Sequence, residues 1–276
     1  MSRTWLVTGC SSGLGRAIAE TALAAGNKVV VTARRQEATE AIAIAHPERA
    51  LSLSLDVTDQ ASVDQAVSKA LNWAGSVDVL VNNAAYGLYG AVEEASDDEI
   101  FPLFDTNVLG LIRMVRAVLP GMRGRGAGTV INVGSVAGIV AGPGNGFYAA
   151  SKFAVEALSE ALQAELAPLG VRVVLIEPSG IRTDFHGRSY KRAARRIGAY
   201  KGTAGRQIEA NLSLDGRQAG DPQRMAAVLL GLVDLKEPPF RIALGASSVD
   251  RIRAKLTSML TTLGEFEKVS RSVDFD

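Results

Sequence analysis

Short apolar runs alternate along the chain with longer segments that are rich in alanine and leucine. The runs are rich in β-branched residues and lie at 5–8, 28–32, 51–55, 77–81, 129–133, 171–176 and, more weakly, 240–244. Continuous apolar runs of this length are typical of strands that are buried on both faces of a parallel sheet. Because strand–helix alternation produces right-handed βαβ units, the pattern predicts an α/β fold: a doubly wound parallel sheet of about seven strands flanked by helices.

Local signals also predict where one of the helices begins and ends. Ser96 and Glu99 have the spacing of a capping box, which predicts a helix start, and Pro102 falls in an early turn where we expect a kink. Pro120 and Gly121 predict the end of this helix.

No repeat or low-complexity linker divides the chain, so we expect a single domain over residues 1–276. Residues 182–220 form an exception, because they lack clear periodicity and are rich in glycine and basic residues. We expect them to form a substrate-loop insertion over the carboxyl edge of the sheet. Residues 182–206 hold eight Lys and Arg against one acid. This charge fits either a solvated lid or a segment that attracts an anionic substrate, a cofactor phosphate or a membrane surface.

Composition excludes several classes of protein. The chain has 276 residues, with 30 Lys and Arg against 29 Asp and Glu, which argues against nucleic-acid binding through a basic surface. Cys10 is the one cysteine, so we expect no internal disulfide, no metal site and a reducing, cytoplasmic compartment. No apolar run approaches the ~20 residues of a membrane span. An apolar strand pattern begins directly after residue 4, so we expect no signal peptide.

A glycine-rich segment, Thr8–Gly15, joins the first apolar run to the first helix. Glycines in such a turn let the backbone approach a pyrophosphate, whose charge lies at the helix N-terminus. The segment therefore predicts a dinucleotide cradle that consists of Gly9, Ser11, Ser12, Gly13, Leu14 and Gly15. A glycine-rich turn without a ligand is the alternative, and Cys10 is interpreted as a small loop residue rather than a nucleophile.

The spacing Gly9-x3-Gly13-x-Gly15 resembles the short-chain dehydrogenase/reductase family. Further matches to that family follow in order within residues 3–185: Asp56-Val57, Asn82-Asn83-Ala84-Ala85, Asn107, Ser135, Tyr148-x3-Lys152 and Pro178–Thr183. Two positions depart from the family pattern, because Ala85 and Ser179 stand where glycines are usual. Both are small residues, so the departures affect local loop geometry and not the resemblance.

The resemblance implies a Rossmann-like domain that binds NAD(P) and transfers hydride between a secondary alcohol and a ketone, or between a primary alcohol and an aldehyde. It implies further cofactor contacts from Asp56, Val57, Asn83, Ala84, Tyr148, Lys152, Pro178, Ile181 and Thr183. It also implies that Lys152 holds the nicotinamide ribose and that Asn107 binds a water linking Lys152 to solvent. Self-association is implied as well, through the helices that carry Asn107 and Tyr148.

Two other functions stay open beside this one. A non-catalytic protein of the same fold that senses redox state through NAD(P) needs no catalytic set, whereas this chain combines Asn107, Ser135, Tyr148 and Lys152. The second alternative is an isomerase or epimerase that acts through a transient ketone, but isomerases and epimerases of related fold usually have longer chains.

The chemistry of Tyr148 and Lys152 follows from their spacing. Residues four apart on a helix point the same way, so the ammonium of Lys152, together with an oxidised nicotinamide, is expected to lower the phenol pKa of Tyr148 from ~10. Tyr148 then acts as general acid and base for an alcohol or carbonyl, and Ser135 hydrogen-bonds the substrate oxygen. The alternative is an ordinary pair on a helix surface.

Cofactor choice is predicted from the end of the second apolar run, Val31-Thr32-Ala33-Arg34-Arg35. NAD-preferring members of the resembled family usually carry an acid at the position of Ala33, where it binds the ribose hydroxyls. Arg34 offers a guanidinium to a 2′-phosphate and Arg35 adds positive potential, whereas Ser12 offers only a neutral hydrogen bond. We therefore expect NADP(H) to be preferred, with NAD(H) possible.

The substrate is predicted only by class. In the resembled family the pocket walls come from the loop after Asn83, from residues 136–147 and from the segment after Thr183. The candidate pocket residues here are Tyr86, Ile139, Phe147 and Phe185, with Leu88, Tyr89 and Val140 nearby in sequence. These side chains predict a moderately apolar small-molecule alcohol or ketone.

Overall fold

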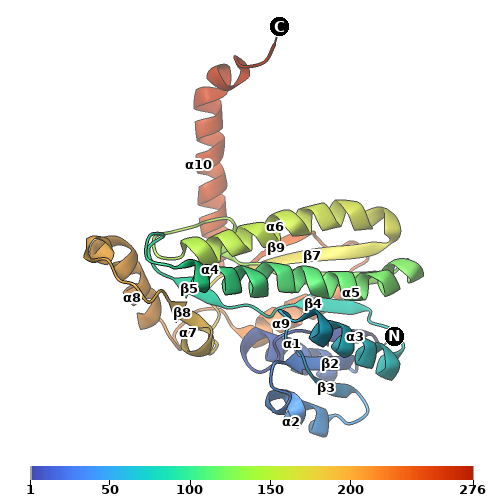
Figure 1. Ribbon diagram of the computed structural model, residues 1–276. Coiled ribbons are helices and arrows are strands. Elements are labelled where there is room, and N and C mark those ends of the chain that lie inside the picture. Colours follow the sequence, from blue (N-terminus) through green and yellow to red (C-terminus); the bar gives the residue numbers. More distant parts are fainter. Residues whose placement is uncertain (1, 276) are drawn as a thin grey trace.

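The computed structural model describes residues 2–275, apart from the side chains at 186 and 188. A sheet of seven parallel strands runs through its centre (Figure 1). Its strand order is β3 (Ala50–Ser54), β2 (Lys28–Ala33), β1 (Thr4–Val7), β4 (Val79–Asn82), β6 (Gly128–Val133), β7 (Val171–Pro178) and β9 (Arg241–Leu244). The predicted doubly wound fold is therefore confirmed.

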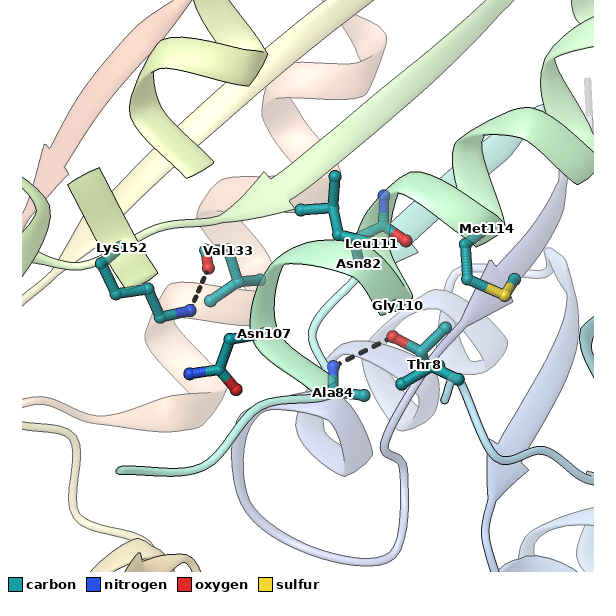
Figure 2. A pocket seen from close by; sticks show the side chains of 10 residues that line it. Thr8, Asn82, Ala84, Asn107, Gly110, Leu111, Met114, Val133 and Lys152 are labelled. Atoms are coloured by element: carbon teal, nitrogen blue, oxygen red, sulfur yellow. Dashed lines mark hydrogen bonds between the residues drawn. The ribbon is translucent and has the colours of Figure 1, made fainter. Parts of the chain in front are cut away.

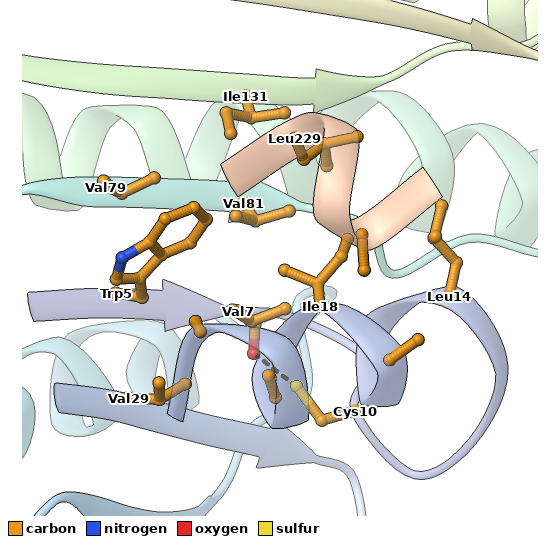
Figure 3. Close-up of a cluster of buried hydrophobic side chains, with 14 of the residues drawn as sticks. Trp5, Val7, Cys10, Leu14, Ile18, Val29, Val79, Val81, Ile131 and Leu229 are labelled. Carbon is orange, nitrogen blue, oxygen red and sulfur yellow. Dashed lines mark hydrogen bonds between the residues drawn. The ribbon is translucent and has the colours of Figure 1, made fainter. Parts of the chain in front are cut away.

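Helices cover both faces of the sheet, which explains why the strands are apolar at consecutive positions. Trp5 and Val7 of β1 point to the face that is covered by α1 (Gly13–Ala24), α2 (Glu37–Ala45) and α9 (Pro222–Asp234) (Figure 3). Leu6 points to the opposite face, under α3 (Gln60–Ala74), α5 (Gly110–Arg125) and α6 (Gly146–Leu166). Each large side chain buried in this way stabilises the fold by roughly 1.5–3 kcal/mol.

The helix that follows the fourth strand is longer than predicted. The backbone N–H of Ser96 donates to the Glu99 carboxylate (2.9 Å), so the capping box is confirmed at the start of α4 (Asp97–Phe104), which contains Pro102. A π-helical turn, η1 (Asp105–Leu109), joins α4 to α5.

The predicted end at Pro120 is wrong, because α5 continues to Arg125. Met122 is fully buried beyond the proline, and the Arg125 guanidinium donates to the Val77 carbonyl (2.8 Å). These tertiary contacts outweigh the hydrogen bond that the proline removes from the helix.

Residues 182–220 carry secondary structure that the sequence pattern did not indicate. They contain α7 (Phe185–Arg188), β8 (Tyr190–Arg192), η4 (Gly198–Tyr200), η5 (Lys201–Gly205) and α8 (Arg206–Ser213). The strand β8 pairs in parallel with β5 (Gly87–Tyr89), so the segment is attached to the loop that follows β4. Two short 3-10 turns complete the described elements, η2 (Val136–Gly138) and η3 (Ala167–Leu169).

The last helix, α10 (Ala246–Arg271), begins beside β9 and projects away from the rest of the chain (Figure 1). Over residues 2–275, no helix combines the length and apolar character that crossing a membrane would require.

Candidate active site

A cavity of about 720 Å³ opens at the carboxyl ends of the strands. The strand order reverses between β1 and β4, and ligands of open α/β sheets bind at this switch point. The cavity is lined by most of the residues expected to bind cofactor: Gly9, Ser11, Ser12, Gly13, Leu14, Arg34, Asp56, Val57, Asn83, Ala84, Tyr148, Lys152, Pro178, Ile181 and Thr183. Gly15 and Arg35 lie outside this lining.

The glycine-rich loop is held in shape by Asn83 from the end of β4. Its amide nitrogen donates to the carbonyls of Thr8 (2.9 Å) and Gly9 (3.1 Å). Gly9 has a φ of +73°, which favours glycine. A Cβ on Gly15 would lie 2.4 Å from both the Asn83 amide nitrogen and the Gly9 carbonyl oxygen. Gly15 therefore serves close packing beneath the loop rather than contact with the cavity.

Cys10 in the same loop is fully buried, and its backbone N–H donates to the Thr32 carbonyl (2.8 Å). Burial raises the pKa of the thiol to about 12, although a separate hydrogen bond between the sulfur and the Thr32 backbone opposes the rise. The thiolate is therefore scarce at neutral pH, which agrees with its interpretation as a small loop residue.

The positive charge at the end of β2 comes from Arg34. Arg34 is exposed and lines the cavity next to Ala33, the buried last residue of the strand. Burial would raise the pKa of Asp56, but hydrogen bonds from Thr58 and the charges of Arg34 and Arg113 hold it below its usual value. Arg34 thus lies in the cavity lining among other charged and polar side chains.

Ser135, Tyr148 and Lys152 lie close together in the lining of the same cavity. Ser135 caps η2, where its hydroxyl accepts from the Ala137 N–H (3.1 Å), and α6 carries Tyr148 and Lys152. Burial raises the pKa of Tyr148, and a hydrogen bond with Ser135 opposes the rise. The Nζ of Lys152 lies 6.0 Å from the centre of the phenol ring.

The ammonium of Lys152 is buried and donates to the Val133 carbonyl (2.7 Å; Figure 2). Burial lowers the pKa of Lys152 to about 8, and the negative charge of Glu156 opposes this shift. A cavity of about 10 Å³ lies beside the lysine, and its lining includes Thr8, Asn82 and Asn107. That volume is close to the minimum for one water molecule, and the lining offers several polar partners.

Asn107 lies in the π-helical turn η1, with both amide N–H groups bonded to the protein. They donate to the Tyr86 carbonyl (2.8 Å) and to the Ser151 hydroxyl (3.0 Å), while its oxygen accepts from the Tyr86 N–H (3.0 Å). Asn107 thus anchors the loop that carries Tyr86. On the Asn107 side chain, only the second lone pair of the oxygen is left without a hydrogen bond.

Aromatic side chains form the wall facing Tyr148. Tyr89 and Phe185 line the cavity with ring centres 5.8 and 6.1 Å from that of Tyr148, whereas Tyr86 lines it near Arg34 and Asp105. Ile139 and Phe147, which were expected in the substrate pocket, are not part of the cavity lining. Phe147 precedes Tyr148 on α6, so its side chain points about 100° away around the helix, and Ile139 follows η2, whose Val136 and Ala137 line the cavity instead.

Several residues that line the cavity were not predicted from the sequence. They come from the start of α6, from the region around α8 and from the first turns of α10: Asn145, Asn211, Leu214, Gln218, Ser247 and Arg251. No local pattern marks them, because their place at the site depends on how segments distant in sequence fold together. Of the basic residues in 182–206, Lys191 lines the cavity and lies 4.4 Å from the Tyr86 ring centre, whereas Arg196 pairs with Glu94.

A buried carboxyl pair, Glu156 and Glu177, lies behind Lys152. One guanidinium, Arg241, contacts both: its Nη2 lies 3.1 Å from Glu156 and its Nε 2.8 Å from Glu177. One cation cannot neutralise two buried carboxylates, so burial and mutual repulsion raise the pKa of Glu156 to about 8. The sequence showed no sign of this pair, because its members come from α6 and β7.

Replacing Glu156 by glutamine should make stability less dependent on pH. The folded-state pKa of Glu156 lies above its ordinary value of 4.5, so its contribution to stability is full below pH 4.5 and is lost as the pH rises toward 8. Urea unfolding at pH 5.5 and 8.5 should show Glu156→Gln gaining more than about 1 kcal/mol over wild type at the higher pH. Glu160→Gln is the matched control, because Glu160 contacts the same arginine (3.6 Å) but is exposed. Equal pH slopes for wild type and Glu156→Gln would contradict this assignment.

Among the described residues, no group of three His, Cys, Asp or Glu side chains is arranged to hold a metal ion.

Comparison with known proteins places this site in a family. The family model described as short chain dehydrogenase matches residues 3–194. The 3-ketodihydrosphingosine reductase of Bacteroides thetaiotaomicron is 36% identical over 241 residues, which cover 87% of this chain and 87% of that protein. A short-chain dehydrogenase structure from Streptomyces avermitilis superposes with a TM-score of 0.93 at 43% identity, covering 100% of both chains.

A short chain dehydrogenase/reductase from Burkholderia phymatum, solved in complex with NAD, has a TM-score of 0.83 at 26% identity and covers 95% of each chain. Other solved structures of this fold hold NADP or an NADP derivative. With its seven-stranded sheet and its match over residues 3–194, the chain belongs to the short-chain dehydrogenase family and is an oxidoreductase with an NAD(P)-binding Rossmann fold.

Proposed function

We propose that the protein is an NADP(H)-dependent oxidoreductase that interconverts a secondary alcohol and a ketone, or a primary alcohol and an aldehyde. The observation that carries the proposal is the convergence of Ser135, Tyr148 and Lys152 in the lining of a cavity that the glycine-rich loop also lines. A protein that only senses cofactor occupancy has no use for this convergence.

The residues present fit a dinucleotide cofactor. Arg34 lies near Asp56 in the cavity lining, the loop Gly9–Gly15 lies beside the N-terminus of α1, and Lys152 lines the same cavity. The N-terminus of α1 favours the negative charge of a pyrophosphate. When bound, the nicotinamide would supply or accept the hydride.

The protein's own residues handle the proton. Burial raises the pKa of Tyr148 further above its ordinary value of 10.0. The phenol is therefore protonated at neutral pH and is ready to donate a proton to the oxygen of a ketone. Ser135 donates a hydrogen bond to the same oxygen and stabilises its developing negative charge. Lys152 would bind the ribose of the cofactor and, with the small polar cavity beside Asn107, return a proton toward Tyr148.

The substrate proposed is an apolar ketone or alcohol. Tyr86, Tyr89, Phe185 and Leu214 give the cavity apolar surface, and the reductase name of the Bacteroides relative supports a ketone as the reducible group. A panel of aliphatic, aromatic and steroid-like ketones, each assayed with NADPH and with NADH, tests the proposal. Turnover of apolar ketones with NADPH is expected. Binding of NADPH without turnover of any panel member, or of the matching alcohols with NADP⁺, would favour the sensor.

Self-association and compartment are also part of the proposal. Along α6, Ala157, Ala161 and Ala164 are exposed and Ala154 is half-buried, so this stripe does not pack on the sheet and is free for a close helix–helix contact. We propose that a second copy packs there, in a dimer or tetramer. The single cysteine suits a reducing, cytoplasmic setting.

A further inference from the structure

The helix α10 is anchored to the body only through its first turns. The Ser248 hydroxyl donates to the Glu177 carbonyl (2.6 Å), and the Arg251 guanidinium donates to the Val140 carbonyl (3.3 Å). From Arg253 to Phe275 every residue is exposed, and this part of the helix extends free of the body (Figure 1). Residues 253–271 alone span about 28 Å at 1.5 Å per residue.

The exposed part carries an apolar stripe with the spacing of a coiled coil. Apolar residues alternate at intervals of three and four along Val249, Ile252, Leu256, Met259, Leu263 and Phe266. Leu256, Met259, Leu263 and Phe266 are each between 50% and 60% exposed, so nothing in the described chain covers them. A period of 3.5 residues keeps one face of a helix turned toward a helical partner, which distinguishes this stripe from one that packs on a sheet.

The exposed part of α10 also has a sequence that would form only a weakly stable helix in isolation. Thr257, Ser258, Thr261, Thr262 and Gly264 have low helix propensity and fall in its middle. Helices in proteins owe most of their stability to packing of an amphipathic face. The stripe therefore indicates a partner that stabilises the helix.

We propose that the partner is α10 of a second copy of this chain, packed antiparallel. With the pair centred near residue 261, Met259 of one copy packs against Leu263 of the other, and Leu256 against Phe266. Flanking positions then bring Arg253 of one copy to Glu267 of the other, twice by symmetry. Within one copy Arg253 already lies 3.8 Å from Asp250, and Glu267 lies 2.9 Å from Arg271, so the contact forms a row of alternating charges.

A parallel pair lacks this complementarity. There the flanking contacts would join Lys255 to Leu260 and Thr262 to Glu267, and no pair of opposite charges results. The antiparallel pairing also differs from the contact proposed at the alanine stripe of α6, because it uses none of the same residues.

Sedimentation equilibrium at micromolar concentration tests the pairing. Leu263→Lys should halve the particle mass, whereas Thr261→Lys, on the opposite face of the same helix, should leave the mass unchanged. Arg253→Glu and Glu267→Arg should each weaken association at least tenfold, and the double variant should restore it. Because these residues lie outside the folded body, near-ultraviolet circular dichroism should match wild type in every variant.

Cross-linking tests the orientation. Arg253→Cys mixed with Glu267→Cys should form a linked dimer with a short bis-maleimide, whereas neither protein should cross-link alone; Cys10 is buried and does not interfere. A parallel pair would instead cross-link two chains of Met259→Cys and give no linked dimer when Arg253→Cys is mixed with Glu267→Cys. That result would overturn the proposed geometry. If Leu263→Lys had the same particle mass as wild type, the pairing itself would be overturned. That conclusion would hold even if α10 were then found to bind the body of its own chain or vesicles of anionic lipid.

Discussion

Tyr148→Phe is expected to lose about 10²–10⁴-fold in kcat, with cofactor binding retained. The change removes the hydroxyl that we propose exchanges a proton with the substrate, and it keeps the ring that lies 5.8 Å from Tyr89 and 6.1 Å from Phe185. Steady-state turnover measures the loss, and quenching of NADPH fluorescence by titration measures cofactor affinity.

Tyr200→Phe is the matched control for this experiment. Tyr200 also carries a hydrogen-bonded hydroxyl, which donates to Glu93 (2.7 Å), but it is not part of the cavity lining. The control should keep wild-type turnover. If Tyr148→Phe kept more than about a tenth of wild-type kcat, its role as general acid and base would be wrong.

The second large effect is expected in cofactor preference. Arg34→Ala should lower kcat/KM for NADPH about 10–100-fold with little change for NADH, because a hydrogen bond to a charged group contributes about 1.5–3 kcal/mol. Ala33→Asp should shift the ratio further, since a carboxylate at the end of β2 repels a 2′-phosphate and binds the ribose hydroxyls of NAD(H).

Arg35→Ala is the matched control for Arg34→Ala. The two arginines are adjacent and both exposed, but only Arg34 lines the cavity. The control should change the ratio of kcat/KM values less than threefold. Equal use of NADPH and NADH by wild type, or an unchanged ratio in both Arg34→Ala and Ala33→Asp, would contradict the NADP(H) preference.

The sequence by itself determined the fold class and the principal candidate residues. Strands buried on both faces leave continuous apolar runs, and a turn beside a phosphate needs glycine at set places, so both are local signals. Thr8–Gly15 and Tyr148-x3-Lys152 could therefore be recognised without a structure, and the structure brings them to one cavity.

Only the tertiary structure decided how these residues are supported and what surrounds them. The pKa of Tyr148 depends on its burial, which no spacing on a helix reveals. The pair Glu156 and Glu177 exists because α6 lies beside β7, and the continuation of α5 past Pro120 depends on burial of Met122.

The cavity wall also combines residues that the sequence predicted with residues that only the tertiary structure revealed. Phe147 was expected in the substrate pocket from its place in the sequence, whereas Leu214 and Arg251 line the cavity because α8 and α10 approach the sheet edge from far along the chain. Strands and turns are encoded by neighbouring residues, but burial, charge pairing and cavity walls arise between residues that only the folded chain brings together.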